Sequence, residues 1–470
     1  MKRTKIICTM GPNTNDKELL KQLALEGMDV ARFNFSHGDY EEHLSRYKLL
    51  KEVREETGIE VASLLDTKGP EIRTGKLKDG LKVNLETGKE YTLTITECIG
   101  DERKGFVNYA GLIDDVKVGS RILIDDGIIE LEVTKIEGDN IHCIIINGGE
   151  LGEKKGVNVP GVEVRLPALT DKDKEDIKFA CEKGFDFIAA SFVRDADCIH
   201  QIKDIIKEYA AHTMVIAKIE SQQAVKNIDE IIEASDAIMV ARGDLGVEIP
   251  TEEVPFVQKT IIKKCNIACK PVITATQMLD SMIRNPRPTR AETTDVANAI
   301  YDGTDAIMLS GETASGDYPV EAVQTMDRIA RRIESSLHYK KLFVGKGLEH
   351  HTTTEAIAHA TVQLAYELDA AAIITPTESG YTTQMVSKYR PKAAIFAFTP
   401  HEQVARHLNL RWGVLPAPAA RLWKDASEMR HMATAAAEKC GAIKPGDVTI
   451  ITSGIKCVPG NTSSIRVYTV

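Results

Sequence analysis

The chain has 470 residues, of which 43% are hydrophobic, and a formal net charge of −10 at pH 7. This length and this hydrophobic fraction are those of a globular protein with about three domains. Because it has no long Lys/Arg run with interleaved aromatic residues and no apolar stretch of membrane-spanning length, we expect neither nucleic acid nor a membrane as a partner.

The amino terminus and the cysteines indicate the compartment. The apolar run in the basic opening is only Ile6-Ile7-Cys8, which is too short for a secretory signal. The nine cysteines are scattered and form no C-x-x-C motif, so we expect reduced thiols rather than disulfides. Both features favour a cytoplasmic protein.

The first part of the chain alternates between predicted strands and helices. We expect strands over residues 5–9, 28–33 and 60–65, and helices over 16–26 and 40–57. A polar cluster follows each of the last two strands, at RFNFSHG (32–38) and at DTKGP (66–70).

The pattern then changes to short alternating segments separated by turns, such as 121–124, 128–136 and 141–146. We interpret residues 70–167 as an inserted all-β domain. It ends in a segment punctuated by glycine and proline, KKGVNVPG (154–161).

The alternation of strands and helices resumes at residue 171. Strands are predicted over 185–190, 214–219, 237–241, 271–274 and 306–309. With the first three, they make eight, the number of strands in a (β/α)₈ barrel. The segments DAIMVARGD (236–244) and DAIMLSGE (305–312) resemble each other, which supports a repeated strand-and-loop unit.

Three charged residues at the ends of two of these strands are candidates for the centre of a site. Lys218 and Glu220 are two positions apart, so their side chains point to the same face of the strand. A helix capped by Ser221 should follow, and the right-handed crossover then brings Asp244 to the same edge. Two carboxylates beside one ammonium suit a Mg²⁺ or Mn²⁺ that also binds substrate oxygens. An ordinary ion pair that caps two strands is the alternative interpretation of this unit alone.

Polar residues are concentrated at the carboxyl ends of the predicted strands, where barrels of this kind place their active sites. They are Arg32, Asn34, Ser36, Asp66, Thr67, Ser191, Lys218, Glu220, Asp244, Thr276 and Glu312.

A third unit begins near residue 346 and alternates again, with strands expected over 371–374, 394–398 and 465–469. It has no G-x-G-x-x-G motif, so a dinucleotide site is not indicated. A loop before its second predicted helix is a candidate for holding the phosphate of an effector, through Thr377, Ser379, Gly380 and Thr382. The predicted fold class is therefore α/β: a barrel (1–69 and 168–345), an inserted small β-barrel domain (70–167) and a carboxyl-terminal open α/β domain (346–470).

Seven motifs in order along the chain resemble those of the pyruvate kinase family. They are RFNFSHG (32–38), DTKGPEIR (66–73), KKGVNVPG (154–161), KIE (218–220), MVARGDLGVE (239–248), TATQMLDSM (274–282) and NPRPTRAE (285–292). The resemblance implies a barrel, a lid formed by the inserted domain, a regulatory carboxyl-terminal domain and a homotetramer. The implied reaction is phosphoryl transfer from phosphoenolpyruvate to ADP, with Mg²⁺ (or Mn²⁺) and K⁺.

The resemblance also implies a role for each matched residue. Catalytic roles fall to Lys218, which neutralises the transferring phosphoryl group, to Arg32, which contacts phosphate, and to Thr276, which lies where the enolate gains its proton. The implied substrate contacts are Arg32, Lys218, Gly243, Asp244 and Thr276; the nucleotide contacts are Arg32, Asn34, Arg73 and Lys155; the Mg²⁺ ligands are Glu220 and Asp244; and the K⁺ ligands are Asn34, Ser36, Asp66 and Thr67.

Two further positions carry expectations taken from the family. A glutamate at position 71, where some relatives have lysine, goes with a requirement for K⁺. The loop 377–382 resembles the family's pocket for fructose 1,6-bisphosphate but has an acidic residue, Glu378, which would repel a phosphate. We therefore expect weak activation by this sugar phosphate, or none.

Two other functions would use the same charged residues. Another barrel enzyme with a metal-held enolate, such as an aldolase or carboxylyase, would need Lys218, Glu220 and Asp244 but not an inserted lid. A catalytically silent metabolite sensor is the second alternative, and it is disfavoured because a costly cluster of charges is typical of a working site.

Overall fold

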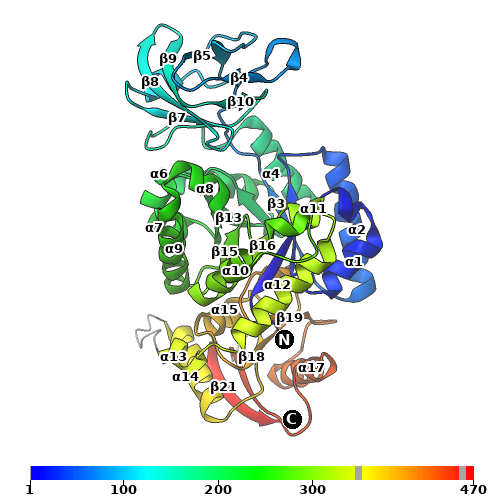
Figure 1. Cartoon of the computed structure of the whole chain (residues 1–470). Coiled ribbons are helices and arrows are strands. Elements are labelled where there is room, and N and C mark those ends of the chain that lie inside the picture. The colour runs from blue at the N-terminus through cyan, green and yellow to red at the C-terminus, as the bar shows by residue number, and fades with distance from the viewer. Residues whose placement is uncertain (1, 345–351, 455–461) are drawn as a thin grey trace.

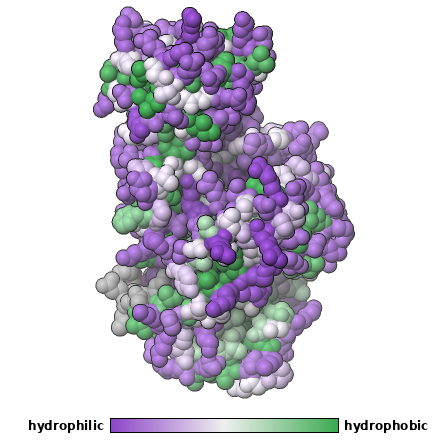
Figure 2. Space-filling model, in the orientation of Figure 1, coloured by the Kyte–Doolittle hydropathy of each residue, from purple (hydrophilic) through white to green (hydrophobic). Residues whose placement is uncertain are grey.

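The computed structural model describes residues 2–344, 352–454 and 462–470. The chain forms three bodies along one axis, with the inserted β domain at one end, the barrel in the middle and the carboxyl-terminal domain at the other end (Figure 1). The space-filling view shows a largely hydrophilic surface and a β domain that stands out from the barrel (Figure 2). No helix within the described ranges has both the length and the apolar character needed to cross a bilayer.

Eight parallel strands close the central barrel in the order β1-β16-β15-β14-β13-β12-β3-β2. They are β1 (Lys5–Met10), β2 (Val30–Asn34), β3 (Ala62–Asp66), β12 (Phe187–Ala190), β13 (Met214–Ile219), β14 (Ala237–Ala241), β15 (Val272–Ala275) and β16 (Ala306–Leu309). Almost every residue of these strands is buried, because side chains on one face fill the barrel and those on the other face meet the helices. The predicted (β/α)₈ fold is confirmed.

An outer ring of helices surrounds the strands (Figure 1). Its members are α1 (Lys17–Leu25), α2 (Tyr40–Thr57), α4 (Asp171–Lys183), α5 (Ala196–Glu208), α6 (Gln222–Lys226), α7 (Ile228–Ala234), α8 (Arg242–Glu248), α9 (Val254–Ala268), α10 (Arg290–Asp302), α11 (Gly311–Ala314) and α12 (Pro319–Glu334), with the 3₁₀ turns η1 (Pro12–Asn15), η3 (Thr251–Glu253) and η4 (Asp280–Ile283). The next helix, α13 (Tyr339–Val344), packs through Phe343 into the core of the carboxyl-terminal domain. Capping boxes start two of them, Thr170 with Asp173 at α4 and Thr289 with Glu292 at α10. Such reciprocal caps satisfy backbone N–H groups that a helix start leaves free.

The helix expected after Ser221 is divided into α6 and α7. Ser221 does cap it, since its side chain accepts a hydrogen bond from the N–H of Ala224. Asn227 interrupts it with φ −94° and ψ 15°, and its side-chain amide donates to the carbonyl of Arg194 at 2.9 Å. The apolar period continues through the break, so the periodicity of the sequence did not reveal it.

The inserted domain is all-β, as predicted. Its strands are β4 (Val83–Leu85), β5 (Glu90–Thr94), β6 (Lys104–Phe106), β7 (Arg121–Ile124), β8 (Ile129–Glu137), β9 (Asn140–Asn147), β10 (Gly149–Leu151) and β11 (Val157–Asn158), with η2 (Lys78–Gly80) and α3 (Leu112–Asp115). They form a sheet in the order β11-β7-β8-β9-β5-β6 and a ribbon of β10 and β4. Isolated bridges such as Thr74–Val107 and Leu77–Gly100 add further pairing within the domain.

The carboxyl-terminal domain is an open sheet covered by helices. Its strands lie in the order β19-β18-β17-β20-β21, and only β21 runs antiparallel to its neighbour. The elements are α14 (Thr353–Glu367), β17 (Ala372–Pro376), α15 (Tyr381–Lys388), β18 (Ala394–Thr399), α16 (Glu402–Leu408), β19 (Val414–Pro418), α17 (Ala426–Lys439), β20 (Val448–Gly454) and β21 (Thr462–Thr469).

This domain closes the amino-terminal mouth of the barrel. Leu410, just after α16, is 1% exposed and belongs to the same apolar cluster as barrel residues such as Phe187. Arg406 binds two carboxylates of the barrel, Asp186 at 2.8 Å and Glu60 at 3.2 Å. The two bodies therefore share a core and an ionic network.

His407 lies in that junction and predicts a pH dependence of stability. It is 8% exposed, its ring packs 5.5 Å from that of Phe187, and Nε2 has no hydrogen-bond partner among the described residues. Burial lowers the pKa of His407. Asp186 and Asp236 oppose this shift and Arg406 adds to it, and the pKa stays below its ordinary value. A histidine with a depressed pKa stabilises the fold above its unfolded pKa, and this contribution is lost as the pH falls.

We therefore expect the melting temperature to drop between about pH 7.5 and 5.5, and His407→Gln to make that drop smaller. Thermal unfolding of both proteins across this range is the measurement. His200→Gln, which changes an exposed histidine on α5, is the matched control. A drop of equal size in wild type and His407→Gln would show that His407 does not titrate with unfolding.

Candidate active site

Lys218 lies in a buried ring of oxygen atoms at the carboxyl end of β13. Its ammonium is 2.8 Å from Glu220 Oε1 and 3.2 Å from Asp66 Oδ1, and it donates to Ser191 Oγ at 2.6 Å. Burial opposes its charge, but Asp66 and Glu220 outweigh burial and hold the pKa of Lys218 above its ordinary value. A fixed cation is thus held at the mouth of the barrel, with both partners on the strand ends predicted from the sequence.

Glu220 is a buried carboxylate between a cation and a second acid. Oε2 accepts a hydrogen bond from the backbone N–H of Phe192, and Oε1 is buried without a hydrogen bond of good geometry among the described residues. Burial raises the pKa of Glu220 to about 7; Lys218 lowers it and Asp244 raises it. Glu220 and Asp244 line the same cavity, so the structure brings these two carboxylates to one site.

Asp244 and Gly243 occupy the first turn of α8, where the sequence suggested a loop. The N–H of Gly243 donates to Thr276 Oγ1 at 2.8 Å, so the residue after β14 meets the residue after β15. A side chain at position 243 would come within 3.6 Å of that hydroxyl. The structure therefore places Gly243, which immediately precedes Asp244, beside Thr276.

Arg32 and Asp66 form the other half of the ring. Arg32 Nε donates to Asp66 Oδ2 at 2.6 Å, and Nη1 donates to Thr9 Oγ1 at 3.0 Å. Burial would raise the pKa of Asp66, but Lys218 and Arg32 hold it below its usual value. Asp66 thus carries a full charge between two cations.

The other residues predicted for K⁺ lie near Asp66 in the fold, since Asn34 on β2 is in register with Asp66 on β3 and Thr67 follows Asp66 in the chain. Asn34 Oδ1 accepts from the N–H of Ser36 at 3.2 Å. Thr67 receives two hydrogen bonds from Ser191, one at Oγ1 and one at the backbone carbonyl. These groups are neutral oxygens beside one carboxylate, which is the kind of donor set that hard cations prefer.

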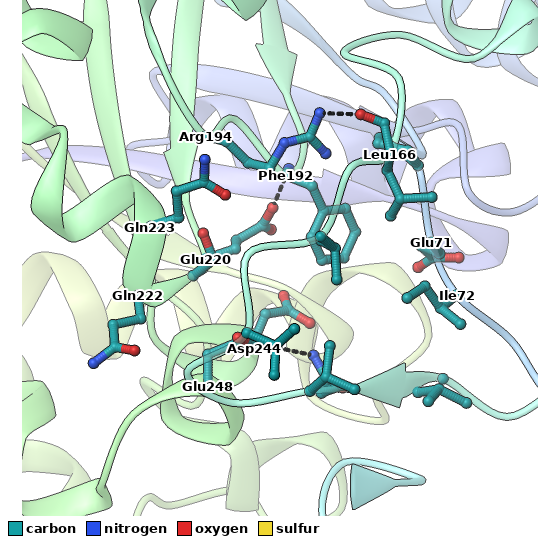
Figure 3. A pocket seen from close by; sticks show the side chains of 18 of the residues that line it. Glu71, Ile72, Leu166, Phe192, Arg194, Glu220, Gln222, Gln223, Asp244 and Glu248 are labelled. Carbon is teal, nitrogen blue, oxygen red and sulfur yellow. Dashed lines mark hydrogen bonds between the residues drawn. The ribbon is translucent and has the colours of Figure 1, made fainter. Parts of the chain in front are cut away.

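A cavity of about 280 Å³ opens between the barrel and the inserted domain (Figure 3). Glu220 and Asp244 line it from the barrel, and Arg73 and Lys155 line it from the two chain connections of the inserted domain. Arg32, Asn34, Ser36, Asp66, Thr67, Lys218, Gly243 and Thr276 are not among its lining residues. The predicted site is therefore divided into a buried ring around Lys218 and an adjoining open cavity.

The inserted domain contributes carboxylates that the sequence analysis did not identify. Lys155 Nζ binds Asp125 at 3.0 Å, and both Asp125 and Asp126 line the cavity. Burial, together with Asp244 and Asp125, raises the pKa of Asp126. Asp244 of the barrel lines the same cavity. Asp125 and Asp126 lie in the turn after β7 of the inserted domain. The expectation that site residues stand at the ends of barrel strands does not predict this position.

One side-chain contact joins the inserted domain to the barrel, and another joins the two chain connections of that domain. Asn158 donates to Glu248 Oε1 at 2.8 Å, from β11 to α8. Arg73 Nη1 donates to the carbonyl of Lys154 at 2.8 Å, which joins the outgoing and returning connections. Arg73 Nε also donates to Glu71 at 2.6 Å.

The contacts of three other residues near strand ends show what each of them does. Ser191 and Thr9 position Lys218 and Arg32; of these, Thr9 was missed, although it too lies near the end of a barrel strand. Glu312 instead accepts from the backbone N–H groups of Leu279 and Ser310, so it holds loops together.

The residues present fit a divalent cation that is completed by other ligands. No group of three or more His, Cys, Asp or Glu side chains within the described ranges is arranged to enclose a metal. Glu220 and Asp244 are two carboxylates at one cavity, and Glu220 Oε1 still lacks a good hydrogen bond. Mg²⁺ is commonly bound in this way, by one or two carboxylates plus substrate oxygens and water.

The candidate effector loop lies at the start of α15. Thr377 Oγ1 accepts from the N–H of Gly380 at 2.9 Å, and Thr382 Oγ1 pairs with Thr462 Oγ1 at 2.6 Å. Ser379 is exposed. Both threonine hydroxyls therefore already have partners within the domain.

Comparisons with known proteins agree over the whole chain. The family model described as "Pyruvate kinase, barrel domain" matches residues 1–323, and "Pyruvate kinase, alpha/beta domain" matches residues 355–468. A pyruvate kinase of Geobacillus stearothermophilus is 52% identical over all of this chain and 80% of its own length, and one of Bacillus licheniformis is 52% identical over 81% of its length. The crystal structure of a pyruvate kinase from Cryptosporidium parvum superposes with a TM-score of 0.95 at 41% identity, covering all of this chain and 96% of that one.

Proposed function

The chain belongs to the pyruvate kinase family and transfers the phosphoryl group of phosphoenolpyruvate to ADP, giving pyruvate and ATP, and we propose here the part that each site residue takes. The observation that carries the proposal is the Lys218 ammonium, buried among Asp66, Glu220 and Ser191 at a strand end. Catalysis of phosphoryl transfer depends mostly on positioning and on neutralising charge at the equatorial oxygens. A preorganised ammonium does both.

We propose that Lys218 and Arg32 bind the transferring phosphoryl group. Both cations are held by Asp66, so their positions are set before substrate arrives. Because this environment excludes bulk water, each charge interacts more strongly with phosphate oxygens than it would in solution. Ser191 and Thr9 keep the two side chains in these positions.

Members of this family depend on a metal ion, and we propose Mg²⁺ or Mn²⁺ at Glu220 and Asp244. When bound, the ion supplies positive charge to the substrate oxygens. Glu220 is oriented for this role by the N–H of Phe192, and Asp244 by the first turn of α8. The N–H groups of Gly243 and Asp244 face the substrate carboxylate in this proposal.

Thr276 is proposed to lie on the side from which the enolate is protonated. Its hydroxyl donates to the carbonyl of Ala275 at 2.6 Å and accepts from the N–H of Gly243. This geometry holds the hydroxyl at the edge of the substrate region that Gly243 and Asp244 define. A positioned hydroxyl can hold or relay a proton at the reacting carbon.

The nucleotide is proposed to lie between the barrel and the inserted domain. Arg73 and Lys155 line the cavity there. Arg32 and Asn34, which stand outside the cavity lining, are proposed to extend the contact from the barrel side. Hydrogen bonds such as Asn158–Glu248 support closure of this domain over the substrates, which would exclude water.

The family resemblance supports further proposals. They are a homotetramer, a cytoplasmic location, a phosphorylated effector at Thr377, Ser379, Gly380 and Thr382 that is not fructose 1,6-bisphosphate, and domain boundaries after residues 69, 167 and 345.

Pyruvate formation tests the reaction and the monovalent ion together. We propose that Asn34, Ser36, Asp66 and Thr67 hold K⁺. Pyruvate should form from phosphoenolpyruvate only when ADP is present, which a lyase or phosphatase would not require. In Na⁺-free tetramethylammonium buffer the rate should fall to a small fraction of that with K⁺.

Glu71→Lys is the informative variant for this ion. Glu71 is tied to Arg73 at 2.6 Å and lies 3.8 Å from Lys68, at the edge of the site. A lysine there should support turnover without K⁺, because its ammonium can take the place of the ion. Equal rates of the wild-type enzyme with and without K⁺ would contradict the K⁺ site and leave the ADP requirement standing.

A further inference from the structure

The backbone that carries Thr276 has an unusual conformation. Thr276 and Gln277 both lie in the left-handed region, with φ of 69° and 53°. A β-branched residue rarely adopts this conformation, because its side chain crowds the backbone. Such a conformation persists only where the surroundings impose it, so the contacts around Thr276 indicate what holds the hydroxyl in place.

The side chain of Arg242 makes those contacts. Its Nε donates to the carbonyl of Ala275 at 3.1 Å and its Nη2 donates to the carbonyl of Thr276 at 2.6 Å. The guanidinium is a rigid planar fork, so hydrogen bonds to these two successive carbonyls define the orientation of two neighbouring peptide planes. The Cα of Thr276 joins those two planes.

Arg242 is in turn fixed from the outer helices. Its Nη1 donates to Asp295 of α10 at 2.7 Å and to Gln258 of α9 at 3.4 Å. The Arg242 side chain is 11% exposed and that of Asp295 is 35% exposed. A line of contacts therefore runs from Asp295 through Arg242 to Thr276.

Arg242 also immediately precedes Gly243, whose N–H donates to the Thr276 hydroxyl. Arg242 therefore acts on Thr276 in two ways. Its side chain binds the carbonyls of Ala275 and Thr276, and it is the first residue of α8, the helix whose Gly243 N–H donates to the Thr276 hydroxyl. Since its guanidinium is engaged by two carbonyls and a carboxylate, Arg242 has no role in direct substrate binding.

We infer that Arg242, oriented by Asp295, is a positioning residue that sets the Thr276 hydroxyl for the protonation of the enolate. The inference rests on the role proposed above for Thr276. In the forward reaction the bond between phosphorus and the enol oxygen breaks, a bond from phosphorus to an ADP oxygen forms, and C3 of the enolate gains one proton. Positioning by Arg242 concerns only this last step.

The proton step can be measured by itself. In the reverse direction the enzyme removes a proton from the methyl group of bound pyruvate and returns a solvent proton, so deuterium enters the methyl group in D₂O without net phosphoryl transfer. A misplaced hydroxyl should slow this exchange, whereas a purely structural defect would lower exchange and phosphoryl transfer together.

The test compares Arg242→Lys and Asp295→Asn with wild type. Lysine keeps the charge but cannot bridge two carbonyls and Asp295 at once. Arg242→Lys should lower methyl exchange, followed by NMR, by about tenfold to 10²-fold, and Asp295→Asn should lower it in the same direction by less. The single-turnover rate of phosphoryl transfer and the KM for phosphoenolpyruvate should change far less than exchange does.

Arg331→Lys is the matched control, because Arg331 forms a similar pair with Asp327 on α12. It should leave both rates unchanged. Equal losses of exchange and phosphoryl transfer in Arg242→Lys would overturn the inference.

Thr276→Ala separates this inference from the proposed function. If Thr276 has its proposed role, Thr276→Ala lowers exchange, and adding Arg242→Lys to it lowers exchange little further, since both changes act through one hydroxyl. If Thr276→Ala leaves exchange intact, the proposed role of Thr276 fails. If Thr276→Ala lowers exchange and Arg242→Lys does not, or the two losses multiply, the inference about Arg242 fails and the role of Thr276 stands.

Discussion

Lys218→Met is expected to lower kcat by about 10²-fold or more while the protein stays folded. The ammonium is the cation that Asp66, Glu220 and Ser191 hold at the centre of the site, and methionine fills its volume without its charge. The charge that builds up on the equatorial oxygens would then lose one preorganised partner. The loss should appear in kcat more than in KM, because the interaction is strongest in the transition state.

The fold should survive this change for a structural reason. Asp66 keeps its hydrogen bond from Arg32, and Glu220 keeps the one from Phe192. Single-turnover kinetics, thermal unfolding and Mn²⁺ binding measured by electron paramagnetic resonance together separate lost chemistry from lost structure. Lys264→Met, which breaks a surface pair with Asp229, is the control. Turnover of Lys218→Met near the wild-type rate would show that the ammonium is not the phosphoryl-binding cation.

Glu220→Gln is expected to weaken Mn²⁺ binding and to lower kcat by about 10²-fold, because a divalent ion contributes several kcal/mol of charge stabilisation. The amide has nearly the shape of the carboxylate, and its oxygen can still accept from the N–H of Phe192. It lacks the negative charge that, with Asp244, attracts the ion. Lys218 would remain paired with Asp66.

The measurement is a Mn²⁺ titration of the substrate-free protein, followed by assays at rising Mg²⁺ concentration. Added Mg²⁺ should recover part of the lost activity, since Asp244 and the substrate oxygens still bind the ion. Glu233→Gln, an exposed carboxylate on α7, is the control. An unchanged Mn²⁺ affinity in Glu220→Gln would remove Glu220 from the metal site.

The sequence pattern was sufficient for those parts of the molecule that depend on neighbours along the chain. Lys218 and Glu220 share a face because strand side chains alternate, and the 2.8 Å contact between them follows from that period. Asp244 joins them because parallel strands with right-handed crossovers end on one face. The eight barrel strands were predictable because strands buried on both faces read as continuous apolar runs.

The sequence pattern did not predict features that depend on contacts between distant segments. The break at Asn227 depends on the carbonyl of Arg194, which belongs to another loop. The strand order of the inserted domain depends on which short strands pair, and short alternating segments specify register weakly.

By itself, the sequence determined the barrel, the inserted and carboxyl-terminal domains, and the strand ends on which the candidate site residues stand. Only the tertiary structure decided that Arg242 reaches the carbonyls of Ala275 and Thr276, that Asp125 and Asp126 face the barrel, and that His407 and Leu410 close its opposite mouth. The reason is physical: periodicity records which face of its own element a side chain takes, whereas these contacts join residues far apart in the chain. Their hydrogen bonds and ion pairs form only over a few ångströms, so they exist only once the packed elements have set those distances.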